Sequence, residues 1–259
     1  MKALKFVIFL IGCFISLNIF AQTPKSIEAD LYKSYQKIDY WFEKKGDATI
    51  KADDSLSKAN EAFGKKLAYY TSKYSFTIHQ KFPLLEKNHI DISSSSDGLL
   101  RIYSWDTETG GTMHFFKNVL QYKTGKKTFS TLETPRADEN IFPDYYKIYL
   151  FKANDRTYYL SVYIVIGSTK ILGDGLQIFD IENGKLNEDV KLIKTPSGMH
   201  SKLNYDYDDS FANWKAEPEI SFDEVTKTIK LPLIALNGKS THRYIAYKFN
   251  GQYFEKVKN

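Results

Sequence analysis

The spacing of hydrophobic residues divides the chain into a helical first part and a strand-rich remainder. In the first part, apolar residues recur every three or four positions, which is the period of an amphipathic helix. The first run follows Thr23-Pro24, a pair typical of a helix start because the first turn does not need the N–H that proline lacks. The predicted inward positions are Ile27, Leu31, Tyr35, Ile38 and Phe42 in a first helix, and Leu56, Ala59, Phe63, Leu67 and Tyr70 in a second.

A short polar link at Gly46-Asp47 separates the two predicted helices, so we expect a helical hairpin over residues 22–74. Each helix has only one apolar face, and that face must pack on another element. No heptad pattern persists long enough for a coiled coil. The pattern therefore favours a hairpin packed on the protein's own β domain over an arm that binds a partner or another copy.

From residue 75 onward the apolar residues form short runs bounded by turn dipeptides, which is typical of antiparallel hairpins. One such hairpin pairs residues 176–180 with residues 186–193. The turn pairs are Asp97-Gly98, Asn154-Asp155, Asn183-Gly184 and Asn250-Gly251. The predicted fold class is α+β, with the helical hairpin followed by an antiparallel meandering β domain over residues 75–259. A rolled sandwich or a small or partial propeller fits this pattern, and the lack of a regular internal repeat argues against a complete propeller.

The first 21 residues have the organisation of a signal peptide. Lys2 and Lys5 precede an apolar run over residues 6–17, and Ala21 stands at the position where a signal peptidase cleaves. The apolar run is short for a membrane span, and no later stretch is long and apolar enough for one. We therefore expect an exported protein, periplasmic or extracellular, whose mature chain has no transmembrane span.

Cysteine content and charge narrow the chemistry further. Cys13 is the only cysteine. The tetrapeptide that ends at Cys13 resembles the lipobox of bacterial lipoproteins, but the apolar residues after it argue against a lipid anchor. A chain cleaved after Ala21 has no cysteine, and therefore no disulfide, thiolate zinc site or cysteine nucleophile. The formal charge of +5 is spread over short lysine pairs, which argues against a nucleic-acid partner.

The densest group of unusual residues lies in a predicted β-hairpin between Ser93 and Tyr122. Alternation along its first strand places Arg101 and Trp105 on one face, Asp106 begins the turn, and His114 lies near the start of the second strand, predicted over residues 113–122. These four residues are our candidate ligand site, a polar and aromatic rim suited to a sugar or a peptide. The competing interpretation has Trp105 in the core, Asp106 capping the turn and Arg101 paired with a carboxylate. Large aromatic residues in strands favour that packing interpretation.

The stretch SSDGLLRIYSWDTETGGTMH, residues 95–114, resembles sequences of a family of uncharacterised exported, strand-rich bacterial proteins. The resemblance is carried by Asp97-Gly98, by residues 101–106 and by residues 110–112. It implies export and a strand-rich fold, and because this family has no assigned activity it transfers no catalytic residue. Residues 174–185 have a looser likeness to the blades of β-propellers.

Motifs for catalysis or metal binding are weak. Asp206, Asp208, Ser210 and Glu217 have spacings like those of a calcium loop, but Phe211 stands where such a loop needs glycine. The sequence contains no HExxH motif, no GxSxG motif and no phosphate-binding loop. We therefore assign no catalytic residue, no metal ligand and no cofactor.

Our leading hypothesis is a non-catalytic, exported binding or interaction protein of the bacterial cell envelope, whose ligand is a glycan or an envelope protein. One alternative is a hydrolase of glycans or peptides built from scattered carboxylates, since acid pairs come from positions far apart in sequence. Another is a structural subunit that assembles through its helices. The oligomeric state is left open.

Overall fold

The computed structural model describes residues 22–47, 51–133, 143–208, 219–238 and 240–257 of the 259-residue chain. The predicted signal peptide, Cys13 and most of the candidate calcium loop lie outside the described residues. Within them, no helix is long and apolar enough to cross a membrane.

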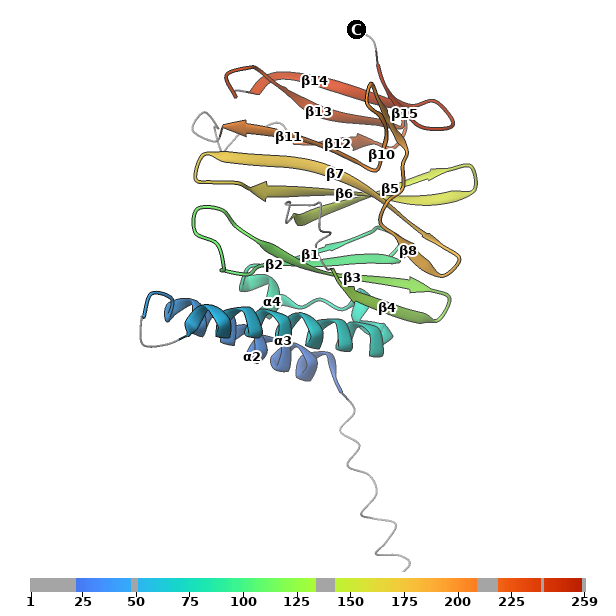
Figure 1. Cartoon of the computed structure of the whole chain (residues 1–259). Helices are drawn as coiled ribbons and strands as arrows, with labels where there is room; N and C mark the ends of the chain where they lie inside the picture. Colours follow the sequence, from blue (N-terminus) through green and yellow to red (C-terminus); the bar gives the residue numbers. More distant parts are fainter. Residues whose placement is uncertain (1–21, 48–50, 134–142, 209–218, 239, 258–259) are drawn as a thin grey trace, which may run out of the picture.

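The helices form the first of four layers, and three β-sheets stack on them (Figure 1). The helical segments are α2 (Pro24–Glu43), α3 (Ala52–Lys73), the 3-10 turn η1 (Ser75–His79) and the single turn α4 (Pro83–Lys87). This arrangement confirms the predicted α+β class, with N-terminal helices followed by a β region, and no sheet of the described residues closes into a barrel.

Each sheet is built mainly from neighbouring antiparallel strands. The first has the order β1 (Ile90–Ser94), β2 (Leu100–Asp106), β3 (Phe116–Thr124) and β4 (Lys127–Leu132). The second has the order β11 (Lys202–Asp208), β7 (Ile171–Glu182), β6 (Arg156–Ile166) and β5 (Asp144–Ala153), and β8 (Lys185–Asn187) pairs with β7. The third has the order β10 (Gly198–His200), β9 (Ile193–Thr195), β15 (Phe254–Lys256), β14 (Ser240–Phe249), β13 (Thr228–Ile234) and β12 (Ser221–Asp223), where β9 and β15 are parallel.

The predicted helix faces are confirmed at every position but one. Thr23 caps α2 in a reciprocal capping box with Ser26, and Pro24 is its first residue. All the other predicted inward positions are buried, but the side chain of Phe42 is 43% exposed. The prediction for Phe42 is wrong because α2 ends at Glu43, and its last turn extends past the surface that the helix covers.

The hairpin packs on the first sheet and shares one hydrophobic cluster with it, in which Leu31 and Phe63 of the helices meet Tyr103 and Trp105 of β2. Gly64 explains how α3 approaches so closely. A Cβ atom at this position would lie 2.8 Å from the Leu132 side chain and 3.2 Å from the Trp105 ring. The glycine that interrupts the helical pattern therefore marks the contact between helix and sheet.

Strand β2 is buried on both faces. Tyr103 and Trp105 face the helices, whereas Leu100 and Ile102 belong to a second cluster together with Tyr159 of the second sheet. The alternation predicted for this strand is confirmed, but both of its faces are interior. β2 is therefore the strand on which the helical layer and the second sheet meet.

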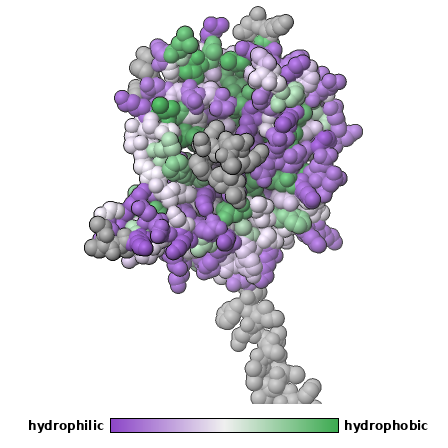
Figure 2. All heavy atoms as spheres, viewed as in Figure 1, coloured by the Kyte–Doolittle hydropathy of each residue, from purple (hydrophilic) through white to green (hydrophobic). Residues whose placement is uncertain are grey.

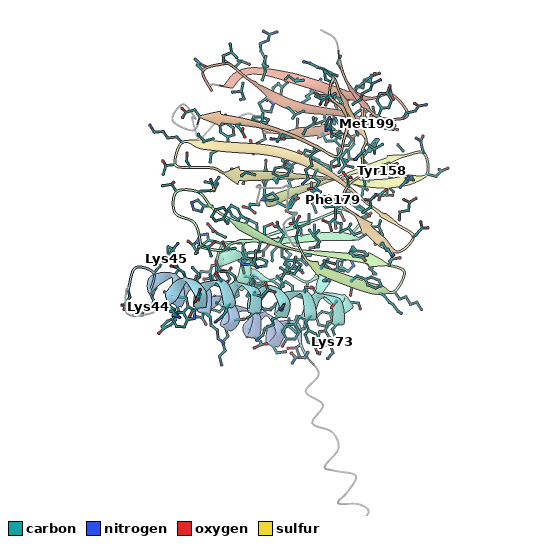
Figure 3. All side chains as sticks on the ribbon, viewed as in Figure 1. Lys44, Lys45, Lys73, Tyr158, Phe179 and Met199 are labelled. Atoms are coloured by element: carbon teal, nitrogen blue, oxygen red, sulfur yellow. The ribbon has the colours of Figure 1, made fainter. Side chains whose placement is uncertain are left out.

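A third cluster joins the second and third sheets. Strands of the second sheet contact both neighbours: Phe179 faces the first sheet, and Tyr158 faces the third (Figure 3). At the centre of the third cluster, the Phe151 ring lies 4.8 Å from that of Phe249 and 5.1 Å from that of Phe254. On the viewed face, hydrophobic residues gather near this C-terminal end and the helical end is mainly hydrophilic (Figure 2).

Two of the four predicted turn pairs have the backbone conformation of a two-residue hairpin. Asn154, Asp155, Asn183 and Gly184 all have positive φ, as such a turn favours. The strand predicted over residues 186–193 is wrong in length, because β8 ends at Asn187 and β9 begins at Ile193 in a different sheet. The apolar residues at the end of this run anchor a crossing between sheets.

Gly175 provides a test of the packing in the second sheet. It pairs with Tyr163 across β6 and β7, and a Cβ atom at Gly175 would overlap the Tyr163 ring. We expect Gly175→Ala to lower the free energy of unfolding by about 1–3 kcal/mol, because the ring must leave its position.

The matched control is Gly111→Ala, since Gly111 has open space around its Cβ position. It should change stability by less than about 0.5 kcal/mol. Urea unfolding measures both variants, and equal effects would contradict the close contact at Gly175.

Candidate functional site

The structure separates the four predicted site residues into two groups. Arg101 and Asp106 lie toward opposite ends of β2, about 17 Å apart at the rise of an extended strand. Asp106 and His114 are in contact, and Trp105 lies beneath them in the interior. The four residues therefore do not form one continuous rim.

Trp105 is fully buried. Its ring packs edge-on against Phe63 at a centroid distance of 5.0 Å, and its Nε1 donates a hydrogen bond of 2.9 Å to Oδ1 of Asn60. The side chain presents no ring face to the surface. Its position is the one that the packing interpretation describes.

Arg101 holds the turn that follows the helical hairpin. Its Nη1 donates to the carbonyl oxygens of Thr77 at 2.9 Å, Ile78 at 3.2 Å and Gln80 at 2.6 Å. The guanidinium also lies over the rings of Phe82 and Tyr103. The carboxylate partner of the packing interpretation is replaced by three backbone carbonyls.

Asp106 and His114 form a pair at the surface end of β2. Oδ1 of Asp106 accepts a hydrogen bond of 2.9 Å from the backbone N–H of Glu108, which caps the turn, and Oδ2 contacts Nδ1 of His114. The His114 backbone N–H donates to the Ile166 carbonyl at 3.0 Å, and the His114 ring stacks on Phe116. Asp106 and Phe116 therefore hold the imidazole, and the Ile166 carbonyl holds the backbone that carries it.

The loop between β2 and β3 is fixed by a lysine from the helical hairpin. Nζ of Lys45 donates to the carbonyl oxygens of Glu108 at 3.1 Å, Thr109 at 3.2 Å and Gly110 at 2.7 Å (Figure 3). A Cβ atom at Gly110 would overlap the Met113 carbonyl, so this position requires glycine. The hydrogen bonds from Lys45 and the close approach of the backbone at Gly110 therefore fix the shape of the loop.

Acidic groups gather where this loop approaches α2. Burial raises the pKa of Glu108, and the nearby charge of Asp106 raises it further. Burial also raises the pKa of Asp39, with a second contribution from Glu43. Partial burial of several carboxyl groups at one place favours their protonated forms.

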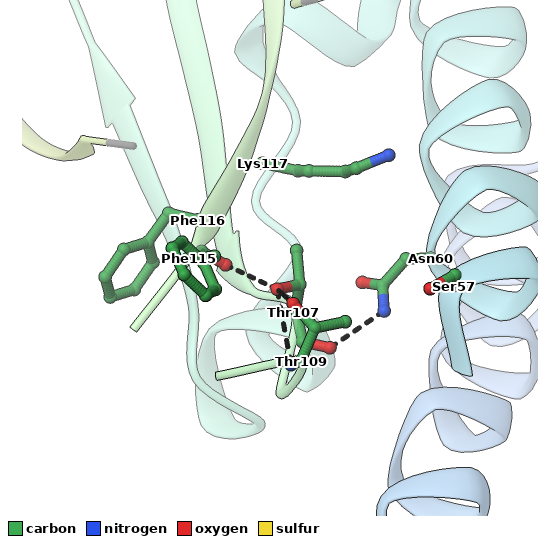
Figure 4. A pocket seen from close by; sticks show the side chains of 7 residues that line it. All are labelled: Ser57, Asn60, Thr107, Thr109, Phe115, Phe116 and Lys117. Carbon is green, nitrogen blue, oxygen red and sulfur yellow. Dashed lines mark hydrogen bonds between the residues drawn. The ribbon is translucent and has the colours of Figure 1, made fainter. Parts of the chain in front are cut away.

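A pocket of about 320 Å³ opens between this loop and α3 (Figure 4). It is mostly apolar and is lined by Ser57, Asn60, Thr107, Thr109, Phe115, Phe116 and Lys117. Polar groups of Asn60 and Thr107 in this lining are hydrogen-bonded within the protein. Nδ2 of Asn60 donates to the Thr107 carbonyl at 2.8 Å, and the Thr107 hydroxyl donates to the Phe115 carbonyl at 2.7 Å. At the edge, Lys117 pairs with Glu61 at 3.1 Å.

One feature of the sequence indicates this pocket. Asn60 lies on the buried stripe of α3, one turn after Leu56 and three residues before Phe63, where a polar residue needs a hydrogen-bonding partner. Lys45 offered no such signal, since its partners are backbone atoms more than sixty residues away.

A second polar network lies between the first and second sheets, behind Asp106. The Ser104 hydroxyl donates to Oδ1 of Asn118 at 2.6 Å and accepts from the Tyr145 backbone at 3.0 Å. Asp144 is only 8% exposed, and one of its carboxyl oxygens has no partner among the described residues. Burial, followed by the charge of Asp91, raises the pKa of Asp144 to about 8.

Within the described ranges, no group of three or more histidine, cysteine, aspartate or glutamate side chains could hold a metal ion. No protein-family model matches this chain, and no curated protein matches it. The function is therefore argued from the site alone.

The buried position of Trp105 can be tested by measuring the stability of a variant. We expect Trp105→Ala to cost about 3–5 kcal/mol of unfolding free energy, because it leaves a cavity and removes the partner of Asn60. Tyr40→Ala is the control, since Tyr40 is exposed, and should cost less than about 1 kcal/mol. Denaturant unfolding separates the two, and wild-type stability in Trp105→Ala would contradict the buried position.

The raised pKa of Asp144 can be tested by measuring stability as a function of pH. Its folded-state pKa is raised, so between about pH 4 and pH 8 the native state holds a proton that the unfolded state has lost. The stability that Asp144 contributes is therefore complete below about pH 4 and is lost as the pH rises to 8. We expect Asp144→Asn to lose less stability than the wild type between pH 5 and pH 8 in urea titrations.

The control for this measurement is Asp155→Asn, in an exposed turn, which should keep the wild-type dependence on pH. An unchanged dependence in Asp144→Asn would show that the buried carboxyl group does not hold its proton across this range.

Proposed function

We propose that this protein is an exported, non-catalytic binding module of the bacterial cell envelope, and that its ligand site is the pocket between α3 and the β2–β3 loop. The observation that carries the proposal is this preformed, mostly apolar pocket with a few fixed polar groups, the usual composition of a small-molecule site. The basic and apolar residues at the start of the sequence support the export.

The residues that line the pocket indicate the chemistry of its ligand. Phe115 supplies an apolar part of the lining, while Ser57 and Thr109 provide hydroxyl groups beside it. A ligand with an apolar face and hydroxyl groups at its edge fits such a lining, and this is the chemistry of a sugar residue. In this proposal Phe115 takes the place of Trp105 as the aromatic residue that contacts the glycan.

The Asp106–His114 pair supports a second candidate, a hydrolase. The carboxylate contacts Nδ1 of His114, and Nε2 has no hydrogen-bonding partner among the described residues. An imidazole oriented in this way can accept a proton from a substrate or a water molecule. No hydroxyl group of the described residues donates to His114, so the candidate reaction would use water as the nucleophile.

The third candidate, assembly through the helical hairpin, has less support. The apolar stripes that the sequence predicts for both helices are largely buried against the protein's own first sheet, so they are not available to another copy.

A thermal-shift screen of the chain from Gln22 against envelope glycans tests the proposal. A bound ligand raises the melting temperature as its concentration rises. We expect Phe115→Ala to weaken the binding of the responding sugar at least tenfold, while Phe129→Ala, which changes an exposed phenylalanine of β4, leaves binding unchanged. Equal binding by the two variants, or no shift with any glycan, would contradict the proposed site.

The same sugar distinguishes binding from hydrolysis. If the protein only binds, incubation leaves the glycan intact and His114→Gln has no effect on its recovery. Release of reducing ends by the wild type, abolished in His114→Gln, would support the hydrolase instead.

A further inference from the structure

The guanidinium of Arg101 uses only one of its two edges. All of its hydrogen bonds to the described residues come from Nη1. Nε is buried without a partner, and no hydrogen bond from the described part of the chain involves Nη2. Nε–H and Nη2–H point in nearly the same direction, and together they form the edge that binds two oxygens of one carboxylate or phosphate group.

Arg101 is also a buried cation without an anionic partner. The side chain is 5% exposed, and no carboxylate of the described residues lies within ion-pair distance of it. Carbonyl groups and aromatic rings compensate part of the charge. A buried charge is costly unless it is paired, so an anion on the unpartnered Nε and Nη2 edge would compensate the charge of Arg101.

Arg101 lines a pocket of about 410 Å³ at the opposite end of β2 from the pocket between α3 and the β2–β3 loop. The pocket is mostly polar, and its lining includes His79, Lys81, Ser94 and Ser96 around Arg101. Two acidic residues also line it, Glu86 and Asp97. Basic groups and hydroxyl donors therefore outnumber acids around the guanidinium.

The acid nearest in sequence to Arg101 is already occupied. Oδ1 of Asp97 accepts hydrogen bonds from the Ser95 hydroxyl at 2.6 Å and the Leu99 backbone at 3.0 Å, and Oδ2 accepts from the Tyr159 hydroxyl at 3.1 Å. These donors hold Asp97 as part of the turn. The hydroxyl groups of Ser94 and Ser96, in contrast, donate to no described residue and remain available.

We propose that this pocket binds a small oxyanion, a phosphate or carboxylate group, through the Nε and Nη2 edge of Arg101. Lys81 adds a second positive charge, and the hydroxyl groups of Ser94 and Ser96 supply further donors. The site is separate from the glycan pocket and does not depend on the proposed function. Its occupant completes the hydrogen bonding of Arg101 and links η1 to the turn before β2.

The experiment titrates inorganic phosphate, sulfate and acetate into the chain from Gln22, against chloride at matched ionic strength. Arginine Nε–H resonances and the melting temperature are followed together. We expect at least one oxyanion to shift the Arg101 signal saturably and to raise the melting temperature. Lys81→Gln should weaken this binding at least threefold, and Arg101→Lys at least tenfold.

Lys87→Gln is the matched control, because it removes the same charge from the adjacent helical turn outside the pocket. It should bind as the wild type does. The proposal would be overturned if none of the three anions gave a saturable shift. It would also be overturned if Lys81→Gln and Lys87→Gln weakened binding equally. This comparison of the two lysine variants is still decisive if Arg101→Lys does not fold. Tighter binding of phenyl phosphate than of inorganic phosphate would identify the occupant as the phosphate group of a larger ligand.

Discussion

The burial of β2 on both faces is the constraint on which the rest of the structure depends. A strand with one face in solvent can carry ligand-binding side chains along its whole length. In β2, however, Tyr103 and Trp105 pack against the helical layer, and Leu100 and Ile102 pack against the second sheet. Ser104, between these residues, has its hydroxyl group hydrogen-bonded inside the protein, so the polar groups that can meet a ligand lie toward the two ends. Asp106 contacts His114 at one end, and Arg101 closes the turn after the hairpin toward the other. The two proposed pockets lie toward these two ends of β2.

The parts of the fold that follow from local physics could be predicted from the sequence. The helical period, the proline and threonine at the start of α2, and the Asn-Gly and Asp-Gly turns each act over a few residues, and each produces the expected element. What covers each face is a property of the whole molecule. Trp105 could not be placed inside by alternation alone, since alternation assigns a residue to a face without saying whether that face meets water or helices. Phe42 shows the same limit at the end of a helix.

The candidate site was predictable only where its parts are close in sequence. Asp106 and His114 meet because a hairpin brings them together, and hairpins are visible in the pattern. The contacts of Arg101 with residues 77–80, and those of Lys45 with the β2–β3 loop, span long stretches of chain. No local pattern encodes such pairs. The glycine at position 64 was visible as an anomaly in a helix, and its explanation is the close approach of the Leu132 side chain and the Trp105 ring.

The order of the layers has a consequence for how the molecule is made. Apart from β11, successive segments of the chain build successive layers, from the helices to the third sheet (Figure 1). When folding proceeds from the N-terminal end of the chain, the hairpin and the first sheet can close on each other early. The outer face of β2 then stays exposed to solvent until β5 to β7 join it, and β7 ends about fifty residues after β4. During this stage Leu100 and Ile102, which are interior in the final structure, are uncovered and can pack against the wrong partner.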